Sequence, residues 1–235
     1  MKKIPCFALI ATSLFLPLWT NAEDPAKARL IDYQLIAPSK NKKAMEAYQT
    51  GTGWLHKGQY AEAEKYLLEA VQEDPAFVDA MDHLGIIYRR TGKPVKAEEW
   101  YRKSIATLPT NPVPYQNLGL LYSLQKKWKD SVVMYQKSID LNPQDPEGYY
   151  GIGSVYVDQN QFAEAEKYLN SAIEKYLLLN SPIVADAYYL KALCQCHQSQ
   201  FQEALQTIEL GLKIQPDDPN LTNLKKICKS QQPRK

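Results

Sequence analysis

Apolar and polar positions recur along this chain with a fixed period. Residues 59–67 read QYAEAEKYL and residues 161–169 read QFAEAEKYL, so the two stretches differ at one aromatic position. They lie 102 residues apart, which is three times 34. A 34-residue period is typical of an array of helical hairpins, in which each unit buries its apolar face against its neighbours. The pattern therefore predicts an all-α chain that works by presenting a surface.

The period places small and bulky residues where two antiparallel helices must meet. Units start at Ala44, Val78, Pro112, Pro146 and, after about five extra residues, Ala185. The eighth place is small and the twenty-fourth is bulky, in the pairs Gly51 and Leu67, Gly85 and Tyr101, Gly119 and Tyr135, Gly153 and Leu169, and Ala192 and Ile208. Small residues allow close approach, and bulky ones fill the remaining space. Proline at place 32 of four units predicts the end of the second helix.

This pattern resembles the tetratricopeptide repeat family over residues 44–216. The resemblance implies a right-handed superhelical solenoid of about five helix–turn–helix units, with a concave groove lined mainly by the first helix of each unit. The expected units are residues 44–77, 78–111, 112–145, 146–179 and 185–218. Such a fold does not by itself identify a partner.

The last part of the array departs from the pattern. Leu177 stands where the fourth unit should have proline, so residues 173–179 are predicted to extend the helix ahead of an insertion at 180–184. Gln195 replaces the usual aromatic residue of the fifth unit, which predicts a less regular unit. Residues 217–230 carry one more first-helix pattern without a partner helix. They are expected to form a capping helix, which an array needs to stay soluble, and residues 231–235 are a tail.

The amino terminus resembles a secretory signal peptide, residues 1–22. Two lysines precede an apolar run from Ile4 to Trp19, and Ala22 supplies the small residue at the expected cleavage site. The run is short for a membrane span, which needs about 20 residues. We therefore expect cleavage after Ala22, no stable membrane span, and a periplasmic or secreted protein; an uncleaved anchor is the alternative.

Residues 23–43 precede the array as a linker or capping segment. Their apolar piece, residues 30–36, has a second interpretation as an internal ligand that docks in the groove. The chain has 28 basic and 26 acidic side chains, and loss of residues 1–22 removes two lysines, which leaves no net charge. A nucleic-acid partner would require a basic surface, so none is expected.

Three cysteines follow the signal peptide: Cys194, Cys196 and Cys228. Cys194 and Cys196 are two apart on one predicted helix and point away from each other, so they cannot pair locally. The stretch CQCH at residues 194–197 lacks a second ligand pair at zinc-site spacing, so we expect no metal and no cofactor.

Thiols exposed in an oxidising compartment tend to pair. The terminal helix should pack near both cysteines, which makes a disulfide to Cys228 a hypothesis, with slight preference for Cys196. Three thiols acting as small apolar groups are the alternative.

In the family it resembles, places 2, 5, 6, 9, 12 and 13 of each unit face the groove. The candidate partner-binding residues at these places are Tyr48, Thr52, His56, His83, Arg89, Asn117, Tyr150, Ser154, Tyr189 and His197. The second unit also places Asp79, Asp82, Ile86 and Arg90 there. Tyrosine offers apolar area and a hydroxyl at small entropic cost, which suits a bound peptide segment. The alternative is that some of these tyrosines pack between neighbouring units. The three histidines are either ordinary lining or a pH-sensitive element.

Together these features favour a non-catalytic scaffold or adaptor that binds a protein or peptide in the assembly or regulation of envelope components. No nucleophile–base pair or glycine-rich phosphate loop is recognisable in the sequence. A self-associating structural module, hence a homo-oligomer, is one alternative. A cytosolic chaperone cofactor is another, but the places of the chaperone-binding carboxylate clamp hold Tyr48, Thr52, His83, Val113 and Asn117, which do not form the clamp.

Overall fold

The computed structural model describes residues 36–231. The predicted signal peptide, residues 23–35 of the segment that follows it and residues 232–235 lie outside the described residues. From Ala37 onward the chain forms one unit. The described part of that unit consists of helices and short turns, without a strand.

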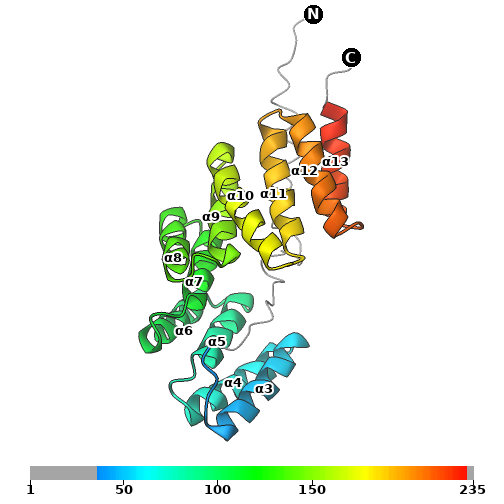
Figure 1. The fold of residues 1–235 in the computed structure, drawn as a ribbon. Helices are drawn as coiled ribbons and strands as arrows, with labels where there is room; N and C mark the ends of the chain where they lie inside the picture. Colours follow the sequence, from blue (N-terminus) through cyan, green and yellow to red (C-terminus); the bar gives the residue numbers. More distant parts are fainter. Residues whose placement is uncertain (1–35, 232–235) are drawn as a thin grey trace, which may run out of the picture. The chain divides into compact units, whose positions relative to one another are not determined.

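The helices follow one another as hairpins (Figure 1). The first helices of the five hairpins are α3 (Lys42–His56), α5 (Val78–Arg90), α7 (Val113–Leu124), α9 (Pro146–Asp158) and α11 (Val184–His197). The second helices are α4 (Tyr60–Glu73), α6 (Pro94–Thr107), α8 (Trp128–Leu141), α10 (Phe162–Leu178) and α12 (Phe201–Ile214), and α13 (Pro219–Gln231) ends the array. Each first helix contacts its own second helix and the first helix of the next hairpin.

The two helices of a hairpin meet where the sequence predicted. A Cβ built on Gly85 would lie 2.3 Å from Cε1 of Tyr101, and one built on Gly119 would lie 2.9 Å from Cδ1 of Tyr135. Because real Cβ contacts are longer, glycine is required at these positions. Tyr135 also reaches the following hairpin, since a Cβ on Gly151 would lie 2.3 Å from its ring. The bulky residue at place 24 therefore joins the two helices of one unit and touches the next.

The turn between the two helices has the same backbone in every hairpin. One residue just past each first helix has a left-handed backbone, with φ between 58° and 71°: Gly58, Gly92, Lys126, Asn160 and Ser199. The first four are spaced by 34 residues, and the last is shifted by the five-residue insertion. A left-handed residue after a helix satisfies the last carbonyl groups of that helix. The left-handed residues therefore recur with the same period as the core contacts.

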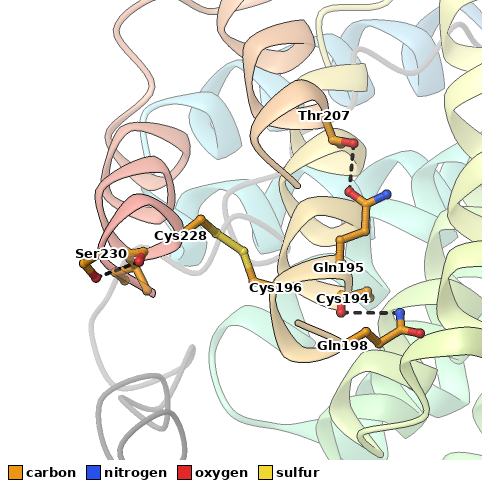
Figure 2. The surroundings of a disulfide bond; sticks show 8 residues. Cys194, Gln195, Cys196, Gln198, Thr207, Cys228 and Ser230 are labelled. Carbon is orange, nitrogen blue, oxygen red and sulfur yellow. Dashed lines mark hydrogen bonds between the residues drawn. A yellow bond between two sulfur atoms is a disulfide. The ribbon is translucent and has the colours of Figure 1, made fainter. Parts of the chain in front are cut away.

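The two departures from the repeat pattern near the carboxyl end change the length of one helix and the packing of one hairpin. Helix α10 has 17 residues, against 14 in α8 and α12. It ends at Leu178, as the absence of the fourth-unit proline predicted. In the fifth hairpin, Gln195 is buried and its Oε1 accepts a hydrogen bond from Thr207 Oγ1 at 2.8 Å (Figure 2). A polar pair thus links α11 to α12 where the other units have an aromatic ring.

The terminal helix α13 covers the last hairpin. Leu221, Leu224 and Cys228 are its buried residues, and Leu221 packs where a Cβ on Gly211 of α12 would lie, 2.7 Å from its Cδ1. A disulfide joins Cys196 of α11 to Cys228, with the Cα atoms 6.3 Å apart (Figure 2). Cys194, two residues from Cys196, is unpaired and buried. This geometry agrees with the preferred pairing, and it links α13 covalently to the hairpin that it covers.

The contact between α5 and α6 at Gly85 can be tested by comparing two glycines in the middle of first helices. Gly85→Ala should lower the free energy of unfolding by about 1–3 kcal/mol, because the added methyl group overpacks against Tyr101. Gly53→Ala is the matched control, since a Cβ on this mid-helix residue meets nothing within 4 Å. It should raise the free energy of unfolding by up to ~1 kcal/mol, because alanine favours a helix over glycine. Urea unfolding followed by circular dichroism measures both, and equal changes would contradict the contact.

The disulfide predicts how the protein responds to reductant. Exported protein that has lost residues 1–22, purified without reductant and denatured, should show one reactive thiol, that of Cys194. Cys228→Ser should lower the free energy of unfolding by about 3 kcal/mol, because the bridge closes a loop of about 30 residues in the unfolded chain. Reductant should lower the stability of the unsubstituted chain and leave that of Cys228→Ser unchanged. Three reactive thiols would contradict the bridge.

Candidate functional site

All ten residues predicted to bind a partner lie on first helices, but they differ in burial. Tyr48, His83 and Asn117 are buried, each with 6% of its surface exposed. His56 is exposed. The remaining six are half-buried: Thr52, Arg89, Tyr150, Ser154, Tyr189 and His197. The six half-buried side chains therefore keep part of their surface accessible to a partner.

Tyr48 packs between the first two hairpins. Its ring lies 4.9 Å from that of Phe77 and 5.4 Å from that of His83, centroid to centroid. Burial raises the pKa of its hydroxyl above the ordinary value, and nearby Asp79 raises it further. The interpretation of Tyr48 as a ligand anchor is therefore corrected: neighbouring first helices lie close enough for this ring to fill the space between them. The alternative, a packing residue between units, applies to Tyr48.

The histidines have unlike environments. Nδ1 of His83 donates to the backbone oxygen of Asp79 at 2.8 Å, and burial lowers the pKa of this ring. His197 stacks on Phe162 with 4.4 Å between ring centroids, and burial lowers its pKa as well. Lowered pKa values keep both rings neutral to more acidic pH than a free histidine. Because His56 lies exposed on α3, the three histidines do not share one environment.

Tyr150 and Tyr189 retain partly open rings on α9 and α11. The ring of Tyr150 meets Tyr176 edge-on, with 6.3 Å between centroids. Burial raises the pKa of Tyr189, and the charge of Asp218 adds to the rise. Thr52, in contrast, uses its hydroxyl within its own helix, donating to the backbone oxygen of Tyr48 at 3.0 Å. Of the three tyrosines predicted to bind a partner, Tyr150 and Tyr189 are thus the two that remain partly exposed.

Helix α5 carries a cluster of charged residues, of which the sequence predicted His83 and Arg89 to bind a partner and placed Asp79, Asp82 and Arg90 in the groove without a role. We call Asp79, Asp82, His83, Arg89 and Arg90 the α5 strip. The residues of helix α5 from Val78 to Tyr88 are all buried, and Arg89 and Arg90 are half-buried, although apolar side chains normally fill such positions. The acidic side chains lie in the amino-terminal half of α5 and the arginines at its carboxyl end. The strip therefore concentrates charged groups in a poorly hydrated part of the array.

Two carboxylate oxygens in the acidic half of the α5 strip accept hydrogen bonds, whereas Asp82 Oδ1 is shielded and has no partner within residues 36–231. Asp82 has 3% of its surface exposed, and one of its carboxylate oxygens accepts from Asn111 Nδ2 at 3.1 Å. Burial raises the pKa of Asp82 to about 8, so the carboxyl group is largely neutral at pH 7. Asp79 Oδ2 accepts the backbone N–H of Ala37 at 3.0 Å. A carboxylate of α5 therefore already binds the main chain of a segment that precedes the array.

The basic half of the strip lacks acceptors. Arg89 Nε and Nη1, and Arg90 Nε and Nη2, are shielded from solvent and have no hydrogen-bond partner within residues 36–231. The same holds for the Tyr101 hydroxyl and for Asn117 Nδ2. Burial raises the pKa of Tyr101 to about 12, and the neighbouring charges of Arg89 and Arg90 oppose that rise. The sequence pattern assigned Tyr101 to packing alone. The signal it left unused is the Tyr101 hydroxyl, one helix before Asn117 in the chain.

Over residues 36–231, no group of three or more His, Cys, Asp or Glu side chains is arranged to hold a metal ion. Every helix in the same range is too short or too polar to cross a bilayer. The first helices therefore offer a ligand hydrogen-bonding and charged side chains.

Comparison with known families identifies the chain. A family profile described as Tetratricopeptide repeat matches residues 55–112 and 150–219, which together exceed half of the chain. A second profile, described as TPR repeat, matches residues 124–160. The chain therefore belongs to the tetratricopeptide repeat family. A search of curated protein sequences found no match.

Solved structures agree on the fold. PilF of Pseudomonas aeruginosa is 22% identical, with a TM-score of 0.68 over 82% of this chain and 88% of its own. TTC0263 of Thermus thermophilus, a thermophilic TPR protein, is 19% identical, with a TM-score of 0.64 over 80% and 99%. YrrB, described as a TPR protein with an unusual peptide-binding site, is 19% identical, with a TM-score of 0.55 over 80% and 94%. The fold is thus the right-handed superhelical solenoid that the sequence predicted.

Proposed function

We propose that this chain is a non-catalytic scaffold or adaptor that binds an extended segment of a partner protein over its first helices. The observation that carries the proposal is the hydrogen bond from the Ala37 amide to Asp79 Oδ2, at 3.0 Å. It is an interaction between a first-helix side chain and a peptide main chain, of the kind that holds an extended ligand. The peptide-binding site named for YrrB, which has the same fold, supports this choice.

The half-buried tyrosines extend this surface along the array. Tyr150 and Tyr189 lie on α9 and α11, and each keeps part of its ring accessible while the rest packs on the helices. Aromatic rings held in this way lose little entropy on binding and commonly dominate interfaces. The ligand is therefore expected to combine main-chain contacts at α5 with side chains that cover the two rings.

We also propose that the protein acts outside the cytoplasm, in the assembly or regulation of envelope components. The lysine pair, the short apolar run and Ala22 in residues 1–22 support export, although these residues lie outside the described part of the chain. The disulfide between Cys196 and Cys228 supports the same compartment, because structural disulfides persist in oxidising environments.

Paired tyrosine variants test the binding surface. Tyr150→Ala with Tyr189→Ala should weaken partner binding by about 2 kcal/mol for each ring that the partner covers. The matched control is Tyr66→Ala with Tyr168→Ala, two half-buried tyrosines on the second helices α4 and α10. Partners are captured by crosslinking in a periplasmic extract, identified by mass spectrometry and titrated by calorimetry, with helicity followed by circular dichroism.

The two double variants have opposite expected outcomes. The first-helix pair should lose the captured partner while keeping its helicity, and the second-helix pair should retain both. If the first-helix pair binds the same partner with unchanged affinity, or if only the second-helix pair loses it, the first helices are not the binding surface.

A further inference from the structure

The carboxyl end of α5 gathers hydrogen-bond donors that nothing in the described chain satisfies. Four guanidinium nitrogens, two each from Arg89 and Arg90, are shielded from solvent without a partner within residues 36–231. A buried donor without an acceptor costs free energy, and the cost is larger for a charged group. Arg102 on the second helix α6 shows the ordinary arrangement, since its Nη2 lies 2.8 Å from Oε1 of Glu98. An acceptor from outside the described chain would therefore complete the pair on α5.

Two more shielded donors without a partner in residues 36–231 lie on α6 and α7, the two helices that follow α5. The Tyr101 hydroxyl is one of them, and the charges of Arg89 and Arg90 oppose the rise in its pKa that burial causes. The repeat relates Asn117 to the same tyrosine. Tyr135, 34 residues after Tyr101, packs against Gly151, which is 34 residues after Asn117. Because equivalent places of successive units have equivalent neighbours, we infer that Asn117 faces Tyr101, at a greater distance than Gly151 from Tyr135 because asparagine carries a Cβ.

We propose that Arg89, Arg90 and Asn117, with the Tyr101 hydroxyl, form a binding site for a carboxylate of the partner peptide. Guanidinium groups bind carboxylates through two parallel N–H···O bonds, and the amide and the phenol add donors of the same kind. Asn117 is buried, with 6% exposed, and its Nδ2 has no partner in the described residues, so the site is built into the array and is not a loose surface cluster.

The charges around the site favour an anion. None of the ion pairs within residues 36–231 includes Arg89 or Arg90. The acidic group of the strip that acts on Tyr101 is Asp82, which is hydrogen-bonded to Asn111 and largely neutral at pH 7. The arginines stand at places 12 and 13 of their unit, which the chaperone carboxylate clamp does not use. The site therefore differs from that clamp even though Asn117 occupies one of its places.

Small carboxylate probes test the site and separate the two sources of a peptide carboxylate. The full chain is titrated with N-acetyl-glutamate amide, which carries a side-chain carboxylate, and with N-acetyl-glutamine, which carries a terminal one. N-acetyl-glutamine amide, with neither, is the control. The readouts are the nitrogen-15 chemical shifts of the Arg89 and Arg90 Nε–H groups and the melting temperature, which a ligand of the folded state raises.

At least one carboxylate probe should shift both Nε–H signals and raise the melting temperature, and the carboxamide should do neither. Replacing both arginines, Arg89→Gln with Arg90→Gln, should weaken the response about tenfold or more, because charge-assisted hydrogen bonds are lost. Asn117→Ala should weaken it less, and Arg102→Gln, on the other helix of the hairpin, should leave it unchanged.

The proposal is overturned if no probe moves the Arg89 and Arg90 signals of the unsubstituted chain, or if the carboxamide moves them equally. The first of these readouts needs no variant, so it holds even if the double variant fails to fold. The site rests on the proposed peptide-binding function, but the two can fail separately. Probe binding can be absent while capture of the partner still depends on Tyr150 and Tyr189, and that result would remove the carboxylate site alone.

Discussion

The close approach of the two helices in each hairpin is the constraint on which the rest of the array depends. Glycine at place 8 lets the bulky residue at place 24 lie directly on the first helix, as Tyr101 does on Gly85. In the third unit the same ring continues across to the next hairpin, where Tyr135 meets Gly151. One side chain therefore sets both the spacing within a unit and the step to its neighbour. The first helices come into mutual contact as a result, and their inward places become partly buried.

This burial gives α5 its unusual character. Charged and amide side chains that would be hydrated on an isolated helix are held away from water, and each must find a partner or change its protonation. Asp82 does both, through Asn111 and a raised pKa. Asp79 accepts a main-chain amide. The arginines at the carboxyl end of α5 have no such compensation within the described residues, which is why this end of the helix suits an anionic ligand.

The periodic features of the fold were predictable from the sequence because they depend on local residue types. The glycine and tyrosine pairs, the length of α10 and the terminal helix follow from residues at fixed spacing. The burial of Tyr48 was not predictable, because the repeat places define a helical face but not how closely the next hairpin covers it. The unsatisfied state of Arg89 and Asn117 was hidden for the same reason: it depends on which acceptors from other helices come within reach, and residue spacing carries no such information.

The central claim is that the first helices, and α5 in particular, form the ligand surface. Amide hydrogen exchange of the full chain, measured with and without a captured partner, tests it most directly. Bound partner should slow the exchange of backbone amides in α5, α7, α9 and α11 and leave the exchange of amides in α6 and α8 unchanged. Protection confined to the second helices, or to α13 at the end of the array, would contradict it.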